Sequence, residues 1–202
     1  MVAVVIFGIA FLVRWRCLAG SCPPALLTRW FDLDAVGGVP RSFTSWVFVA
    51  VAVLAWQARS AAVGRVARWW GGVVAIGIGL AVAKTLSVHS AVKSDLAAAG
   101  TLLLGVTVAV PILLLLDWCG RRWGVPGARA TTVALGLYAI ASLGLDLLTA
   151  LVVAVEARPG PVSLAGATLV EELGEALTAL WILVVVHRHA APDRATSRAP
   201  EE

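Results

Sequence analysis

Charged residues are scarce in this 202-residue chain, at 14% of the total, while hydrophobic residues make up 60%. Soluble domains contain about 25% charged and about 45–50% apolar residues. A soluble chain of this length cannot bury so much apolar surface in one core. The composition therefore excludes an ordinary soluble domain and predicts that a lipid bilayer surrounds the protein. The net charge of +4 comes from short arginine clusters between apolar runs, which fits a membrane surface and not a nucleic-acid partner.

Cysteine is also rare, and the three cysteines form neither a CxxC metal motif nor a disulfide framework. Cys17 and Cys22 could pair if their loop faces an oxidising compartment, which would leave Cys119 unpaired. We expect three free thiols. The chain also lacks HExxH, GxSxG, P-loop and dinucleotide-binding motifs, so the sequence indicates no particular cofactor or catalytic residue.

Long apolar segments dominate what remains. Crossing a hydrocarbon core of about 30 Å takes about 20 residues of helix. Five segments approach or exceed that length: 42–58, 69–88, 96–116, 130–155 and 161–186. The apolar stretch 1–13 is short and resembles either a tilted first helix or a signal-peptide core. We predict an all-α, polytopic transmembrane bundle over residues 1–189, with six spanning helices preferred over five.

Three further features complete this architecture. Residues 23–42 are too polar to span and predict an interfacial segment, while residues 190–202 predict a disordered cytoplasmic tail. Glycines on the 69–88 helix predict close packing between helices: Gly71, Gly72, Gly77 and Gly79. Tryptophans near the predicted span ends are typical of an aromatic belt: Trp46, Trp56, Trp69, Trp70, Trp118 and Trp123.

Arginine placement predicts the orientation. Basic stretches at 59–68, 117–129 and 187–198 alternate with the nearly neutral stretches 89–95 and 156–162. The positive-inside rule places the basic stretches in the cytoplasm. We therefore predict a multipass protein of the cell (plasma or inner) membrane with a cytoplasmic C-terminus. Four arginines in the predicted external stretch 14–42 run against this orientation at the first helix: Arg14, Arg16, Arg29 and Arg41.

Ionisable residues inside the apolar spans are the best candidates for a functional site. Glu171, Glu172 and Glu175 fall on one side of the last helix, at a depth of about 12–21 Å. Asp146 on the preceding helix lies at a similar depth, on a polar stripe with Tyr138 and Ser142. Carboxylates near mid-bilayer cannot face lipid. We predict a polar cavity that opens outward and is lined by Asp146, Glu171, Glu172, Glu175, Lys84 and His89.

Such a cavity suggests a binding or transport protein for a cation, a proton or a small polar ligand. A metal site formed by Glu171, Glu175, Asp146 and His89 would instead suggest an intramembrane enzyme acting on lipid. An accessory subunit remains a third possibility, with the polar groups holding helices together or binding a membrane partner. A buried Lys84–carboxylate network that only fixes packing is the simplest alternative. At this size a carrier would need to form a homo-oligomer.

Three motifs together resemble an uncharacterised family of bacterial, largely actinobacterial, multipass membrane proteins. They are Phe31-Asp32-Leu33-Asp34 with Pro40, Leu86-Ser87-Val88-His89, and Glu171-Glu172-Leu173-Gly174-Glu175. The family shows a DLD segment, an LSxDE…HE-like segment and an EExxE segment in this order. In the middle motif this chain has His89 and Ser90 where the family has acids. The resemblance implies a helical membrane architecture and, if those acids form a site, an altered one here.

Overall fold

The structure is a computed structural model that describes residues 2–33, 37–86, 98–155 and 160–190. Within these ranges the fold is all-α, with seven helices and no strand. The helices are α1 (Val2–Leu18), α2 (Ala25–Phe31), α3 (Val39–Ala61), α4 (Gly64–Thr85), α6 (Ala98–Arg122), α7 (Ala128–Val155) and α8 (Pro161–Ala190). The predicted helical fold class is therefore confirmed.

Each of the five long apolar segments forms a helix, and most of these helices extend beyond the predicted bounds. The predicted ends at residues 88 and 96 lie outside the described residues. Four helices are long and apolar enough to cross a membrane: α3, α4, α6 and α7. The predicted count of six spans is thus not reached by these criteria. Helix α1 has only 17 residues, and α8 has 30 residues but carries three glutamates.

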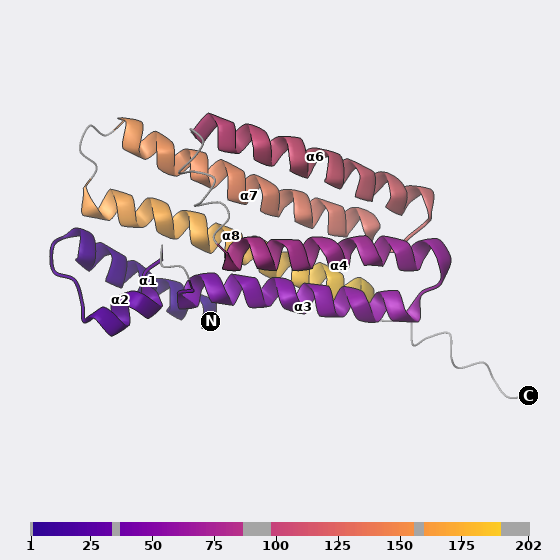
Figure 1. The fold of residues 1–202 in the computed structure, drawn as a ribbon, viewed down its shortest axis with the longest axis horizontal. Coiled ribbons are helices and arrows are strands. Elements are labelled where there is room, and N and C mark those ends of the chain that lie inside the picture. Colours follow the sequence, from indigo (N-terminus) through magenta and orange to yellow (C-terminus); the bar gives the residue numbers. More distant parts are fainter. Residues whose placement is uncertain (1, 34–36, 87–97, 156–159, 191–202) are drawn as a thin grey trace, which may run out of the picture.

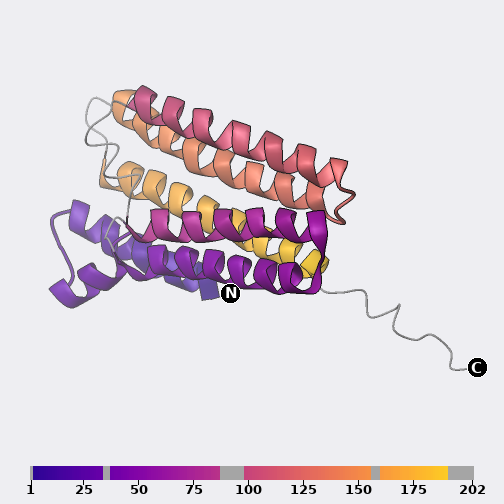
Figure 2. The same cartoon turned by 45° about the vertical axis from the view of Figure 1, so that its right-hand side comes forward.

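The long helices run side by side in one elongated bundle (Figure 1). Helix α3 packs against α4 and α8, α7 packs against α8, and α6 packs on α7. Helix α1 packs against α8 and α3, and the short α2 lies next to α1 and α3. Both views show that α4 and α6 approach each other at one end of the bundle and diverge toward the other (Figure 2).

Close packing of α3 on α4 depends on one glycine. A Cβ atom at Gly77 would lie 3.2 Å from the Ala52 Cβ and 3.3 Å from the Phe48 carbonyl oxygen. Such contacts are tighter than ordinary van der Waals packing, so the two backbones meet at this point. We predicted that Gly79 also allows close packing between helices. This prediction is wrong, because a Cβ at Gly79 would meet no atom within 4 Å.

The arginine-rich stretches gather at one end of the bundle. The α3–α4 and α6–α7 connections and the end of α8 lie together there (Figure 1). Arg68 lies over the Trp123 ring, 5.7 Å from its centroid. Gly127, with φ +73°, lies against His189, and a Cβ at Gly127 would overlap the imidazole ring. This common end is what the positive-inside pattern requires.

The opposite end carries α1, α2 and a disulfide bond. Cys17 and Cys22 are bonded, with their Cα atoms 4.0 Å apart, so our expectation of three free thiols is wrong. Only Cys119 is free in the described ranges. The Gly20 turn, with φ +80°, reverses the chain after α1 and brings the two cysteines together. The Arg14 guanidinium lies 3.4 Å from the Asp32 carboxylate and connects α1 to the end of α2.

Candidate functional site

Four charged side chains from three helices meet in one buried group, which we call the ion-pair cluster: Arg41, Lys84, Glu172 and Glu175. The Lys84 ammonium donates to a carboxylate oxygen of Glu172 at 3.0 Å and also to Glu175. The Arg41 Nε atom lies 3.4 Å from the other Glu172 oxygen. One ammonium is thus shared by two carboxylates, and a guanidinium lies beside one of them.

Helix geometry explains how this cluster forms. Glu172 and Glu175 are three residues apart on α8, so their side chains lie on the same face. Arg41 lies in the first turn of α3 and Lys84 in the last turn of α4. Relative to those two spans the cluster is therefore at the end, and not at the mid-depth predicted from α8 alone. The difference arises because α8 begins about 17 Å before Glu172, where α1 packs against it.

The protein encloses the carboxylates of the cluster. Glu172 is 3% exposed and Glu175 is 4% exposed, so neither is open to bulk water. The side chain of Lys84 is 15% exposed and fills the place between them. The outward-opening cavity, which also involves Asp146 and His89, stays a prediction. A groove of about 520 Å³ does lie between α4, α6 and α7, but the four described members of the predicted site, Lys84, Glu171, Glu172 and Glu175, do not line it.

Arg41 is the member of the cluster that sequence reasoning missed. It was counted as a loop charge that argues against the orientation of the first helix. Arg41 directly follows Pro40, which stands at the N1 or N2 position of a long apolar helix, and this placement was the available signal. A charge in the first turn of a span can turn inward to a buried partner, and its side chain is 11% exposed here.

The remaining predicted site residues are only partly described. Glu171 is half-buried on α8 and has an interaction of its own. Asp146 lies on α7, but its side chain is outside the described part of the structure, and His89 is outside it altogether. Within the described ranges, no three His, Cys, Asp or Glu side chains gather closely enough to hold a metal ion. The metal hypothesis, which needs Asp146 and His89, stays a prediction.

Tyr138 connects the cluster to the groove. Its ring packs edge to face on Phe48, with centroids 4.8 Å apart, and it lines the groove between α4, α6 and α7. Its hydroxyl is within hydrogen-bonding reach of Ser142, and Glu175 and Glu172 are nearby. Tyr138 and Ser142, two residues of the polar stripe predicted on α7, both line the groove.

These features indicate a helical membrane protein with a buried ion-pair cluster near one end of its spans. Comparisons with models of known protein families, with curated proteins and with solved structures found no match. The resemblance to the bacterial multipass family stays a prediction that rests on the three sequence motifs.

Proposed function

We propose that this chain is a binding or transport-type membrane protein that takes up a small monovalent cation or a proton between Glu172 and Glu175. The observation that carries the proposal is the sharing of one ammonium by two nearly inaccessible carboxylates. An ammonium group has the charge of a monovalent cation and lies where that cation would bind. Lys84 then acts as a built-in counter-charge that the incoming ion replaces.

A packing role alone gives a weaker explanation of the cluster. Buried ion pairs often contribute no more stability than well-packed apolar residues of the same volume. Apolar side chains would therefore hold α3, α4 and α8 together at least as well, and the presence of four charges supports a role in binding.

Lys84 is suited to such an exchange. It lies in the last turn of α4, and its ammonium sits on a flexible four-carbon stem. Its side chain is also more exposed, at 15%, than the two carboxylates it contacts. Withdrawal of this one side chain removes the ammonium that both carboxylates share.

The proposal includes a membrane topology. Pairing of Glu172 and Glu175 with Lys84 lowers the cost of placing α8 in lipid, so we propose α8 as a fifth span, while α1 packs at the end of the bundle that carries the disulfide. The arginine-rich end of the bundle then lies in the cytoplasm, with the C-terminus on that side of the cell membrane.

Ion-dependent stability of the purified protein tests this function. In detergent, the midpoint of thermal unfolding is measured in sodium or potassium chloride against N-methyl-D-glucamine chloride of equal ionic strength. An ion present at ten times its Kd stabilises the folded protein by about 1.4 kcal/mol. A second arm measures proton entry into proteoliposomes with an internal pH dye under an imposed gradient. We expect a response in one arm for the natural chain and its loss in a Glu172→Gln, Glu175→Gln variant.

Two further variants sharpen the test. Lys84→Met removes the competing ammonium, so cations should stabilise this variant more than the natural chain. Asp117→Asn is the matched control, because Asp117 pairs with the exposed Arg121 at 2.7 Å, away from the cluster. It should respond as the natural chain does. The proposal is wrong if neither arm responds in the natural chain, or if the double glutamine variant responds equally.

A further inference from the structure

A groove lies between α4, α6 and α7, and it is separate from the ion-pair cluster. Its two walls meet at one end only, where the Trp69 indole nitrogen donates to the Leu116 carbonyl oxygen at 2.9 Å. From that contact α4 and α6 diverge (Figures 1 and 2), and α7 forms the floor. The space between the walls is about 520 Å³, which is within the usual range of about 300–1,000 Å³ for small-molecule pockets.

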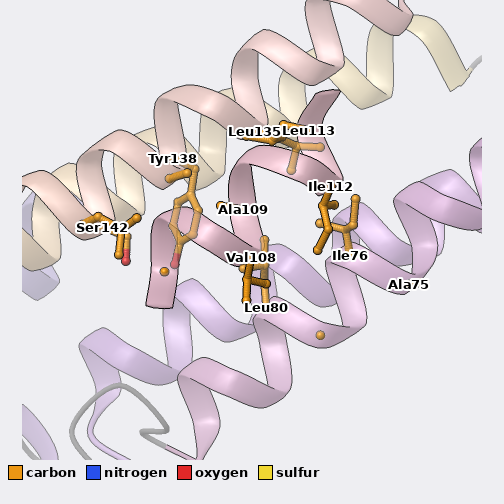
Figure 3. A pocket seen from close by; sticks show the side chains of 14 residues that line it. Ala75, Ile76, Leu80, Val108, Ala109, Ile112, Leu113, Leu135, Tyr138 and Ser142 are labelled. Carbon is orange, nitrogen blue, oxygen red and sulfur yellow. The ribbon is translucent and has the colours of Figure 1, made fainter. Parts of the chain in front are cut away.

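The lining of the groove changes in character along its length. Tyr138 and Ser142 lie near one another, and Ile76, Ile112 and Leu113 lie farther toward the other end (Figure 3). The other described lining residues are aliphatic or glycine, so among the residues that the structure describes the two hydroxyl groups are the polar side chains of the groove. The groove thus combines a long apolar part with one polar end.

The surroundings of the groove limit what can occupy it. Helices α4, α6 and α7 are three of the four helices that can span a membrane. The face of α6 beside the groove is apolar and exposed, at Leu104, Val108 and Ile112. Because bilayer hydrocarbon surrounds such a surface, the occupant enters from lipid and its larger part is apolar.

We propose that this groove binds the acyl chain of a membrane lipid, with the hydroxyl or ester group of the lipid at Tyr138 and Ser142. The chain covers the apolar walls, and the polar group receives or donates hydrogen bonds at the end of the groove next to the ion-pair cluster. This site does not depend on cation or proton binding at that cluster, and the two proposals can fail separately.

Filling the groove tests the proposal. A Cβ at Gly79 would meet nothing within 4 Å, and Gly79 lines the groove, so the added side chain of Gly79→Leu occupies its space. Gly144→Leu is the matched control, because Gly144 is an exposed position on α7 with equal room that does not line the groove. Ala109→Leu fills the groove from α6 and serves as a second variant if Gly79→Leu does not fold.

The probes are diazirine-labelled palmitic acid and phosphatidylcholine with a diazirine in one acyl chain, in nanodiscs of unlabelled phosphatidylcholine. Cross-linked residues are mapped by mass spectrometry. We expect cross-links concentrated in the groove, at least a fivefold loss in Gly79→Leu, and no change in Gly144→Leu. Tyr138→Phe keeps the ring and removes the hydroxyl, so capture should weaken roughly threefold to tenfold. The two probes distinguish a free fatty acid from a phospholipid.

Two results would overturn the proposal. Cross-links spread evenly over the exposed surface of α6, and equal in natural chain and Gly79→Leu, would show only general contact with lipid. A change of oligomeric state in Gly79→Leu, with no change in cross-linking, would show that the groove is a contact between proteins.

Discussion

Lys84 illustrates how one residue controls the electrostatics of the buried site. Its ammonium contacts Glu172 and Glu175, which come from the same face of α8. Arg41 pairs with Glu172 within the cluster. Without Lys84, Glu175 would therefore lose its cationic partner within the cluster, and Glu172 would keep a single one. The balance of two cations and two carboxylates thus depends on a side chain at the end of α4.

Replacement of Lys84 by methionine should lower stability strongly. Removal of one partner from a buried ion pair costs about 3–5 kcal/mol, because the remaining charge stays buried. We expect most of this loss to be restored by adding Glu175→Gln to Lys84→Met. Unfolding in detergent in the absence of sodium and potassium measures both effects. If Arg121→Ala, which breaks an exposed ion pair, cost as much as Lys84→Met, burial would not be the cause.

Trp69 shows that the same sequence signal can have two meanings. Tryptophans at span ends were interpreted as an aromatic belt, and Trp46, Trp56 and Trp118 are indeed exposed. Trp69 is 2% exposed and donates its indole hydrogen bond inside the protein, to Leu116 of α6. Residue type and position along the helix are equal in the two cases, and only the facing helix decides between them.

At the scale of elements, α3 packs closely on α4 because Gly77 has no side chain. No other glycine of α4 is needed for this contact. Gly71 and Gly72 would place a Cβ at ordinary contact distances of 3.5–3.8 Å from flexible side chains. Gly79, two residues from Gly77, lines the groove beside α6. The two glycines therefore face different neighbours and serve different purposes.

Alanine at these two positions should have opposite effects. Gly77→Ala brings a methyl group against the backbone of α3, and overpacking of this kind costs about 1–3 kcal/mol. Gly79→Ala meets no atom, and the higher helix propensity of alanine should stabilise it by about 0.5–1 kcal/mol. Thermal unfolding of both variants in the same detergent tests this difference. Equal shifts in the same direction would contradict the observed contact.

For the whole molecule, the two ends of the bundle differ in chemistry. One end holds the arginine-rich connections, with Arg59 over Trp56 and Arg68 over Trp123. The other end holds the Cys17–Cys22 disulfide. Disulfides form in oxidising compartments outside the cytoplasm. Charge and cysteine chemistry therefore both support the proposed orientation.

Cysteine labelling on intact cells should report this orientation. In a Cys17→Ser, Cys119→Ser variant, Cys22 should react with a membrane-impermeant maleimide from outside. Val63→Cys, in a chain with all three native cysteines changed to serine, should react only after permeabilisation, because exposed Val63 lies between α3 and α4 at the arginine-rich end. Both variants should label equally in permeabilised cells. The reverse pattern would invert the proposed topology.

The sequence by itself determined the helices and the end at which the basic connections gather. Both follow from local properties, because helix length and apolar content are summed along the chain and arginines stay next to the helices they follow. It also selected Lys84, Glu172 and Glu175, since charged residues are rare within apolar spans. Their common location on one side of α8 follows from helical periodicity.

Only the tertiary structure decided which charges meet and how deep they lie. Arg41 joined the cluster because α3 begins beside the middle of α8, an offset between helices that no periodicity encodes. For the same reason Lys84 lies between the two carboxylates of the cluster, and neither is open to bulk water. The divergence of α4 from α6, which creates the groove, likewise depends on contacts between distant segments. Pairing of Cys17 with Cys22 required the turn at Gly20.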